Sequence, residues 1–244
     1  MSILAVIPAR YASTRLPGKP LVPLGGVPLV LRVLEGLRKC RVDRIVVATD
    51  HEIIQEVVQK AGGEVMMTPK DLASGGDRVA WVAREIPEAS VVLNVQVDDP
   101  FVGPDMIDPL VAKLKEESDL PLALLAKKID NPREIEDPNV VKMVFDARMR
   151  ALYFSRSPIP YPRNAEGALW YKHIGPYAYR RDFLLRFASW EPTPLERTES
   201  LEMLRILEKG YPIGVVPVER DTLEIDTPED VTRCEAYLLR RGDS

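Results

Sequence analysis

The chain has 244 residues, of which 45% are hydrophobic and 29% are charged, and its formal net charge is -4. This length suits one large α/β domain, or a core domain with a modest insertion, and the apolar content is enough for a sizeable core. Basic and acidic residues are mixed without a long basic run, which argues against a nucleic-acid-coating protein, so we expect no nucleic-acid partner.

The cysteines and the N-terminus indicate a cytoplasmic protein. Cys40 and Cys234 are the two cysteines, and neither belongs to a CxxC pair or a Cys/His cluster. The sequence therefore suggests neither a zinc site nor a disulfide framework, and a reducing compartment fits. The first apolar run has no basic leader and is far too short for a signal peptide or a membrane span. We expect no membrane partner.

Strand-like and helix-like segments alternate over the first half of the chain. The strands are continuous β-favouring runs typical of buried parallel strands, and the helices repeat apolar residues at helical spacing. This alternation predicts an α/β fold with a doubly wound, mostly parallel sheet, whose ligands bind beyond the carboxyl ends of the strands. In chain order we expect strands over 3–7, 44–48, 64–67 and 91–95, and helices over 28–40, 52–61, from 74 onward, and 104–115.

The middle of the chain differs, because short strands follow one another there without clear helices between them. Proline-rich segments such as 157–162 separate these strands. We interpret 130–180 as a small antiparallel extension within one domain spanning 1–244, with 122–125 returning to the main sheet. The remaining expected elements are strands over 140–145, 151–154, 173–179 and 213–218, and helices over 181–189, 198–209 and 228–239.

The loop after the first strand carries three cations, Arg10, Arg15 and Lys19, together with Ser13 and Gly18. Fixed cations and backbone N–H groups can hold a polyphosphate and stabilise charge as a P–O bond breaks. The alternative interpretation is a solvated basic loop. The GxxxxGK[ST] spacing of a P-loop is absent.

Carboxylates follow the most apolar strand as Asp98-Asp99. Mg²⁺ held by one or two carboxylates plus phosphate oxygens would satisfy them. The alternative is a turn, which Asp and Pro both favour. Near the C-terminus, Asp226 or Thr227 caps the helix that begins at Pro228, and this capping needs no catalytic explanation. Asp226 would be a metal ligand only if the fold brought it to Asp98.

Two weaker signals remain. Ser74-Gly75-Gly76-Asp77-Arg78 is a glycine-rich turn at a helix start, and such a turn can approach a base or a ribose closely. His173 lies in a strand-like run, where a lone histidine is more often structural than catalytic.

In combination these segments resemble one known family over nearly the whole chain, the 3-deoxy-manno-octulosonate (Kdo) cytidylyltransferases, also called CMP-Kdo synthetases. The related CMP-sialic acid synthetases share the opening pattern but lack the 151–156 block. The resemblance is carried by IPARYASTRLPGKPL at 7–21, VATD at 47–50, SG-x-DR at 74–78, ALYFSR at 151–156, the strand at 173–179 and DTPED at 226–230.

The resemblance implies a Rossmann-like nucleotidyltransferase core and a defined reaction. The anomeric hydroxyl of Kdo attacks the α-phosphorus of CTP, which gives CMP-Kdo and pyrophosphate for lipopolysaccharide biosynthesis. The family also implies Mg²⁺ as the cofactor, and a homodimer that pairs through the smaller extension.

The resemblance further implies roles for individual residues. Arg10, Lys19 and Asp98 would be the catalytic set, with the two cations holding and polarising the phosphates. Arg15 would steady the leaving pyrophosphate, and Asp98 with Asp226 would bind the metal. The implied nucleotide site comprises Pro8, Ala9, Arg10, Ser13, Arg15, Lys19, Ser74, Gly75 and Arg78. The implied sugar-acid site comprises Gln96, Arg156, His173, Tyr177 and Glu202, with Arg156 or His173 as the counter-charge for the sugar carboxylate.

Several positions near the implied site depart from the family pattern. Val97 replaces a glycine, Asp99 a glutamate, Gly76 a threonine and Met203 a glutamine, and the usual Gly-Ile-Tyr-Gly reads GPYA at 175–178. If the family glycine has a positive φ, valine would obstruct the metal segment. Three alternatives follow. The enzyme tolerates these changes and makes CMP-Kdo, it uses a variant ulosonic acid such as 8-amino-Kdo, or it is a paralog that binds nucleotide with little or no catalysis.

Overall fold

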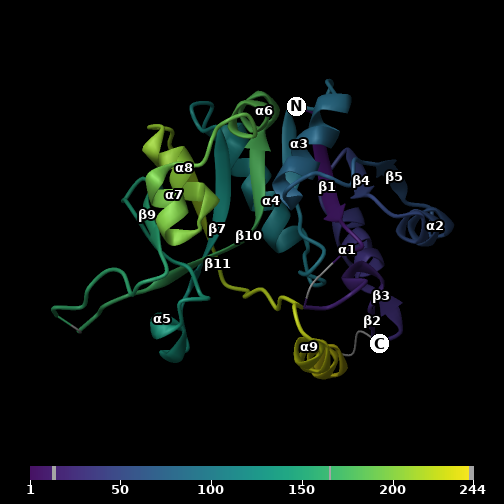
Figure 1. The fold of residues 1–244 in the computed structure, drawn as a ribbon. Helices are drawn as coiled ribbons and strands as arrows, with labels where there is room; N and C mark the ends of the chain where they lie inside the picture. The colour runs from purple at the N-terminus through teal and green to yellow at the C-terminus, as the bar shows by residue number, and fades with distance from the viewer. Residues whose placement is uncertain (13–14, 165, 242–244) are drawn as a thin grey trace. The chain divides into compact units, whose positions relative to one another are not determined.

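The computed structural model describes residues 1–12, 15–164 and 166–241. The chain divides into two compact units, which are described separately below. Unit 1 comprises 1–108 and 222–244, and unit 2 comprises 109–221. Helix α4 (Pro104–Glu116) carries the chain from the first unit into the second (Figure 1).

Unit 1 is built on four parallel strands in the order β6-β1-β4-β5. Every residue of the central strand β1 is buried, because it has a parallel partner on each side and helices packed against it. The alternating strands and helices confirm the predicted α/β class. The strands are β1 (Ile3–Ala9), β4 (Arg44–Thr49), β5 (Glu64–Met67) and β6 (Val91–Asn94), and the helices are α1 (Leu29–Arg38), α2 (Glu52–Lys60), α3 (Gly75–Glu85) and α9 (Pro228–Arg241).

Helix α1 shows how the core positions the loop that carries Asp98. Its apolar side, including Leu34 and Leu37, is buried. A Cβ atom on Gly36 would lie 2.3 Å from the carbonyl oxygen of Val102, so only glycine permits this close approach of the 95–103 segment. The packing of α1 therefore helps to determine where that segment lies.

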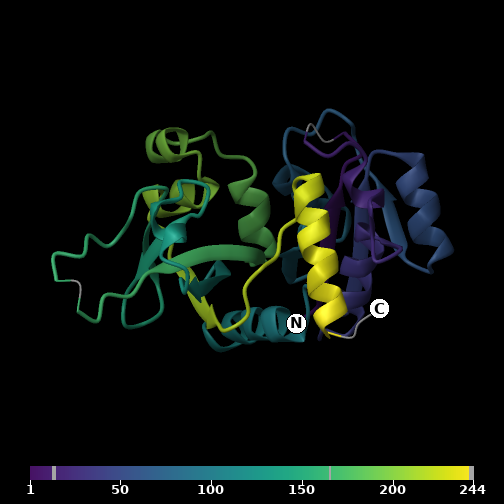
Figure 2. The same cartoon turned by 90° about the horizontal axis from the view of Figure 1, so that it is seen from below.

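A small hairpin between the first loop and α1 was missed by the sequence prediction. It consists of β2 (Pro23–Leu24) and β3 (Val27–Pro28), and the short 3-10 helix η1 (Lys19–Leu21) precedes it. Gly25 and Gly26 have φ values of 54° and 76°, as the tight turn between two short strands requires. Helix α9 packs beside β2, and Figure 2 shows it running along unit 1.

Unit 2 has a mixed sheet. Strand β7 (Leu122–Lys128) pairs with β11 (Ile213–Val218) in parallel and with β10 (Tyr171–Arg180) antiparallel. Two further strands, β8 (Lys142–Phe145) and β9 (Ala151–Ser155), continue the antiparallel pairing from β10. The segment predicted as an antiparallel extension, 130–180, thus contains β8, β9 and β10, together with the one-turn helix α5 (Arg133–Glu136).

The helical part of unit 2 corrects one expectation. The predicted helix over 198–209 is two helices, α7 (Pro194–Glu199) and α8 (Glu202–Glu208), which follow α6 (Arg181–Phe187). Ser200 ends α7 in a left-handed conformation with φ 55°, and a helix cannot continue through such a residue. The apolar periodicity of the sequence continues across this break, so it did not reveal it.

No helix in the parts of the chain that the structure describes is long and apolar enough to cross a membrane.

Candidate active site

The predicted polar segments of unit 1 meet at one edge of its parallel sheet. The strands β1, β4 and β6 end at Ala9, Thr49 and Asn94, and the polar residues follow directly. Because the carboxyl ends of parallel strands share an edge, the loops after them converge there.

Lys19, Asp98 and Asp226 form the centre of this edge. The Lys19 Nζ atom lies 2.8 Å from Oδ2 of Asp98 and 3.0 Å from Oδ1 of Asp226. The lysine side chain is 12% exposed, and the two carboxylates are 24% and 31% exposed. The three charged groups are therefore partly shielded from water. Their mutual attraction is stronger than it would be at an open surface.

Local capping explains why the Asp226 carboxylate is available. The Thr227 hydroxyl accepts a hydrogen bond from the Asp230 N–H (3.3 Å), and the Asp230 carboxylate accepts from the Thr227 N–H (2.9 Å). Thr227 is thus the residue that caps α9, the point which the sequence had left open. The Ile225 N–H donates to the Asp98 carbonyl (2.9 Å), and this bond ties the two acidic segments together.

The electrostatics keep Lys19 charged. Burial disfavours its ammonium group, but Asp98 and then Asp226 outweigh that effect and hold the pKa of Lys19 above its ordinary value. Arg15 adds a second cation, with a guanidinium nitrogen 3.0 Å from Oδ2 of Asp226. Lys19 and Arg15 therefore neutralise the two aspartates in this structure.

Glu224 is an acidic neighbour that the sequence interpretation missed. Although part of its surface reaches solvent, its carboxyl group lies in desolvated surroundings near Asp98, Asp99 and Asp226. Burial, followed by repulsion from these three carboxylates, raises the pKa of Glu224 to about 7. A signal was present, since Ile225 between Glu224 and Asp226 is fully buried, and alternation places the two acids on the same side of an extended segment.

The donor set of this centre fits a divalent cation. Carboxylate oxygens from Asp98 and Asp226 both lie within 3.0 Å of one cationic nitrogen, so two acidic groups already converge on a single positive charge. Within 1–12, 15–164 and 166–241, no group of three or more His, Cys, Asp or Glu side chains is arranged to hold a metal. Two carboxylates completed by phosphate oxygens and water match the habit of Mg²⁺.

The other residues of the predicted nucleotide site in and after β1 differ in their exposure to solvent. Arg10 is exposed and has no ion-pair partner among the described residues, so its guanidinium is available to a ligand. Pro8 and Ala9 are buried in β1, and only their backbone can face a nucleotide. Ser13 lies outside the described residues.

The predicted Ser74 turn is a capping box at the start of α3. The Ser74 hydroxyl accepts from the Asp77 N–H (3.0 Å), and the Asp77 carboxylate accepts from the Ser74 N–H (3.1 Å). A Cβ atom on Gly75 would lie 3.3 Å from Oε1 of Gln96, so this turn lies against the predicted sugar-site glutamine. Arg78 is 2% exposed, and its contacts are all with protein groups.

The structure shows where the residues that depart from the family pattern lie. Among the described residues the non-glycine residues with positive φ are Met149 and Ser200, so Val97 needs no left-handed backbone, and its side chain is buried. Valine at 97 therefore creates no backbone strain. Asp99 is buried after β6, and its Oδ1 accepts from the Phe101 N–H (3.4 Å). Met203 is buried in α8.

The predicted sugar-site residues other than Gln96 belong to unit 2. The Arg156 guanidinium donates to the carbonyl oxygens of Glu199, Pro138 and Ser200, at 2.7, 2.8 and 3.4 Å. His173 and Tyr177 are neighbours on β10, with ring centroids 5.3 Å apart, and Glu202 is the first residue of α8.

His173 is not suited to the role of counter-charge. Burial lowers the pKa of His173 to about 4, and its Nε2 atom is buried with no hydrogen-bond partner within the described chain. The ring is therefore neutral near pH 7. A neutral imidazole with an unused nitrogen can hydrogen-bond a sugar hydroxyl, but it cannot balance a carboxylate.

The fold and this cation–carboxylate centre define the class as an α/β nucleotidyltransferase. The cytidylyltransferase family model matches residues 4–220. A solved structure of CMP:2-keto-3-deoxy-manno-octonic acid synthetase complexed with CTP is similar, with a TM-score of 0.95 and 40% identity over 99% of this chain and 100% of that one.

Curated relatives extend the similarity over almost the full chain. The 3-deoxy-manno-octulosonate cytidylyltransferase of Syntrophotalea carbinolica is 49% identical, over 98% of this chain and 99% of that protein. The enzyme of the same name from Synechococcus elongatus is 45% identical over the same shares. The chain belongs to the 3-deoxy-manno-octulosonate cytidylyltransferase family.

Proposed function

We propose that this protein transfers CMP from CTP to the anomeric hydroxyl of Kdo, giving CMP-Kdo and pyrophosphate. The observation that carries the proposal is the convergence of Lys19, Asp98 and Asp226 at the carboxyl edge of the unit 1 sheet. Family membership, and the CTP complex formed by the similar synthetase of known structure, support the same reaction.

The cations of the first loop would neutralise the negative charge of a triphosphate. Nucleotidyl transfer depends mainly on alignment and on neutralising charge at the reacting phosphate and the leaving group. Arg10, which has no protein counter-ion among the described residues, and Lys19 would hold the phosphates. Arg15 would exchange its contact with Asp226 for the leaving pyrophosphate.

Asp98 and Asp226 would hold Mg²⁺. When bound, the metal neutralises phosphate oxygens and lowers the energy of the charge that develops during transfer. The two aspartates would position this charge, since one is anchored after β6 and the other by the cap of α9. Glu224 adds a third acidic group beside them, and its pKa is raised first by burial and then by repulsion from Asp98, Asp99 and Asp226.

The sugar acid would contact Gln96, Arg156, His173, Tyr177 and Glu202. Neutral His173 and Gln96 offer hydrogen bonds to sugar hydroxyls, and Arg156 is the cationic member of the set. Met203 and Val97 are both buried, which supports the view that these departures are accommodated by the fold. The curated relatives and the similar solved synthetase are named for this sugar acid, which favours CMP-Kdo over a variant ulosonic acid and over a non-catalytic paralog.

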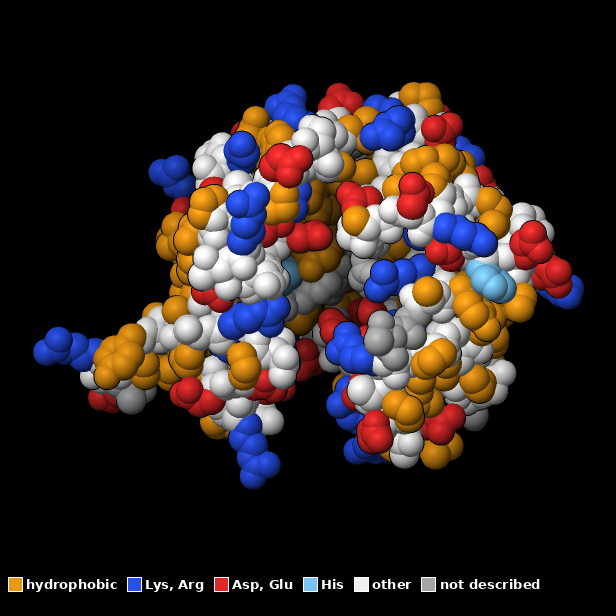
Figure 3. Space-filling model, in the orientation of Figure 1, with side chains coloured by type: hydrophobic (Ala, Val, Ile, Leu, Met, Phe, Trp, Pro, Cys, Tyr) orange, Lys and Arg blue, Asp and Glu red, His pale blue; other side chains and the backbone are white. Residues whose placement is uncertain are grey.

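The proposed context is a cytoplasmic homodimer that supplies lipopolysaccharide biosynthesis. Strand β9 and the loop between β9 and β10 in the 130–180 extension carry large apolar side chains in contact with solvent. Tyr161 is 85% exposed, Leu152 59% and Leu169 49%, and Figure 3 shows hydrophobic surface on this segment at the left of the view. Exposed apolar side chains of this kind suit a contact with a second copy of the chain.

The deciding experiment measures pyrophosphate release from CTP and Mg²⁺ with and without Kdo. Kdo-dependent release with CTP, and little with ATP or GTP, would establish the reaction. Release that requires 8-amino-Kdo or another ulosonic acid would identify the variant substrate. CTP binding by calorimetry without release for any acid in the panel would identify a non-catalytic paralog.

The dimer is tested separately by analytical ultracentrifugation. We expect the wild-type protein to sediment as a dimer, and Tyr161→Ser with Leu169→Ser to shift it toward the monomer. Leu239→Ser on α9, where Leu239 is 75% exposed, is the matched control. A monomeric wild-type protein, or a double variant that remains fully dimeric, would contradict pairing through the extension.

A further inference from the structure

The start of the first loop is held by contacts that the proposed reaction does not use. The Tyr11 backbone N–H donates to Oδ1 of Asp50 (3.1 Å). The Tyr11 ring stacks on the ring of His51, with centroids 4.0 Å apart and planes 18° apart. Asp50 and His51 follow β4 directly, so the end of one strand holds the loop that follows its neighbour, β1.

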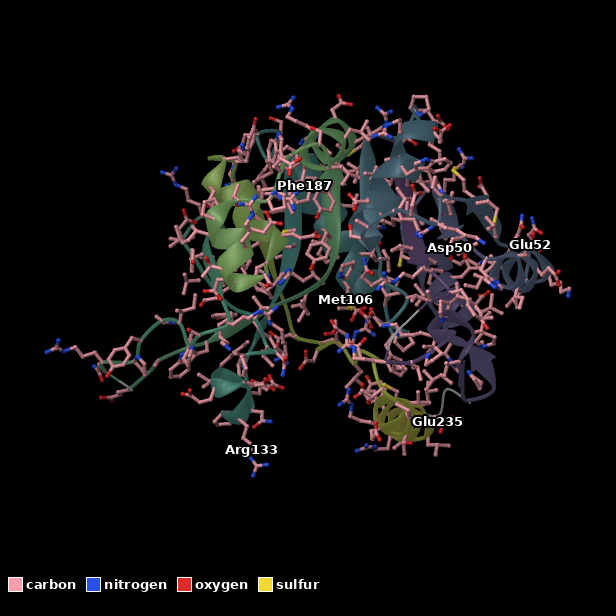
Figure 4. The ribbon with its side chains drawn as sticks, in the orientation of Figure 1. Asp50, Glu52, Met106, Arg133, Phe187 and Glu235 are labelled. Carbon is pink, nitrogen blue, oxygen red and sulfur yellow. The ribbon has the colours of Figure 1, made fainter. Side chains whose placement is uncertain are left out.

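Asp50 is itself held by a buried arginine. Its Oδ2 accepts a hydrogen bond from the Arg78 guanidinium (3.2 Å), and this arginine is 2% exposed. The other Arg78 contacts are the Thr68 hydroxyl and the Pro69 carbonyl. Figure 4 labels Asp50 at the end of β4, close to Glu52 at the start of α2. The Arg78 donors are directed into the protein, so Arg78 acts on the loop through Asp50.

Tyr11 also joins the two ends of the loop. The Gly18 N–H donates to the Tyr11 carbonyl (3.3 Å), and Gly18 has φ 66°. A Cβ atom on Gly18 would lie 3.7 Å from the Tyr11 ring. The position of Tyr11 therefore affects Gly18 and the adjacent Lys19 as well as Arg10.

The His51 ring is fixed from its other side. His51 is the N-cap of α2, and its Nδ1 accepts a hydrogen bond from the Ile53 N–H (3.3 Å). This bond requires an unprotonated Nδ1 and sets the orientation of the ring. The cap of α2 thus fixes the orientation of the imidazole, and the Tyr11 ring stacks on the face of that imidazole.

We propose that Asp50, His51 and Arg78 are positioning residues that hold the phosphate-binding loop through Tyr11. These four residues are called the brace. The inference rests on the proposed function, because it assigns the loop the role of holding the CTP phosphates. It replaces the direct nucleotide contact that the family resemblance implied for Arg78 with an indirect role.

Two substitutions at one position separate stacking from capping. His51→Phe keeps an aromatic ring for Tyr11 but removes the cap acceptor, whereas His51→Asn keeps a good cap but removes the ring. We expect His51→Asn to weaken CTP binding about 5- to 10-fold, and His51→Phe to stay within about 3-fold of wild type while melting at a lower temperature. Calorimetry with CTP measures the affinities, and Glu52→Ala in the next residue is the control.

A purely structural role would give the reverse order, because stability would follow the cap. His51→Asn that binds CTP like the wild type, or His51→Phe that binds as weakly as His51→Asn, would overturn the proposal. Tyr11→Ala combined with His51→Asn should bind no more weakly than Tyr11→Ala alone, because the two rings act as one contact.

The roles of Arg78 and Asp50 are tested by comparing the KM for CTP with the KM for the sugar acid in variants at these two positions. Asp50→Asn and Arg78→Lys should raise KM for CTP about 5- to 20-fold and change KM for the sugar acid less than 2-fold. Equal rises in both constants would indicate a general loss of structure and would count against the proposal.

Hydrogen exchange tests the brace without any ligand. Peptides covering the loop should exchange faster in Tyr11→Ala and His51→Asn than in the wild type, and Glu52→Ala should leave them unchanged. Unchanged exchange in both brace variants would overturn the proposal. This measurement is independent of turnover, so absence of Kdo-dependent pyrophosphate release would count against the proposed function alone.

Discussion

The ammonium nitrogen of Lys19 lies 2.8 Å from Oδ2 of Asp98, and the same nitrogen is 3.0 Å from Asp226. One lysine thus provides the positive charge between the two carboxylates that are proposed to hold Mg²⁺. A divalent cation entering this centre meets a like charge in close contact with both of its ligands. Phosphate oxygens that draw Lys19 toward themselves would remove that competition, so binding of the triphosphate and of the metal should be positively coupled.

Replacing Lys19 by methionine should therefore strengthen metal binding in the absence of nucleotide. We expect Lys19→Met to bind Mn²⁺ about 10-fold more tightly than the wild type without CTP, because a neighbouring positive charge has been removed. CTP should tighten Mn²⁺ binding in the wild type, and should do so much less in the variant. Electron paramagnetic resonance of free Mn²⁺ measures both effects.

Lys60→Met, in an exposed i,i+4 pair on α2, is the control for loss of a lysine. Weaker or unchanged nucleotide-free Mn²⁺ binding in Lys19→Met would show that the lysine does not compete with the metal.

Removing one charge from the acidic pair should slow catalysis strongly without unfolding the protein. We expect Asp98→Asn and Asp226→Asn each to lower kcat by about 10²-fold or more, since each removes a proposed metal ligand. Pyrophosphate release gives the rate, and circular dichroism reports the fold. Asp182→Asn in unit 2, whose side chain is 90% exposed, serves as the matched control. Wild-type turnover in Asp98→Asn would refute its assignment as a ligand.

Gly36→Ala tests the packing that holds the Asp98 segment. A Cβ atom at Gly36 would lie 2.3 Å from the Val102 carbonyl oxygen, and backbone cannot rotate away as a side chain could. We expect Gly36→Ala to lower the free energy of unfolding by about 2–4 kcal/mol, even though alanine has a higher intrinsic helix propensity than glycine. Denaturant unfolding measures the change.

Gly26→Ala is the comparison, since φ is 76° there but no atom lies within 4 Å of the added Cβ. Gly26→Ala should lower the free energy of unfolding by only about 1 kcal/mol, which is the penalty for a left-handed backbone conformation without a steric clash. Equal losses in the two variants would mean that the Val102 contact relaxes freely.

His173 should make stability depend on pH. The buried ring has a pKa of about 4, whereas the same group in the unfolded chain titrates near 6.5. Between these values the unfolded chain binds a proton that the folded chain does not. The free energy of unfolding should therefore fall as pH drops from about 6.5 to 4, by as much as about 3 kcal/mol.

Denaturant unfolding at several pH values checks this expectation, and proton NMR of the imidazole gives the midpoint directly. His173→Gln should flatten the dependence over this range, whereas His51→Gln should leave the His173 part in place. A His173 midpoint near 6.5 would show that the ring is solvated.

Much of unit 1 could be predicted from the sequence because its signals are local. The apolar run of β1, the spacing of α1 and the helix start at Ser74 each depend on residues within a few positions of one another, and the structure contains all three. The cations of the first loop and the acidic pair after β6 were likewise visible in their own segments. The break at Ser200 was not, because periodicity does not report a single left-handed residue.

The meeting of these segments was decided by the tertiary structure. Lys19 lies 79 positions from Asp98 and 207 from Asp226, and no local pattern relates such distant residues. The parallel sheet brings them together by aligning the carboxyl ends of its strands, and the cap formed by Thr227 leaves the Asp226 carboxylate to face the lysine. The same long-range packing buried Arg78, made His173 neutral and crowded Glu224. The sequence thus determined which chemical groups this protein has, while the fold determined which of them carry opposing charges at one point, because burial and proximity exist only once the chain is folded.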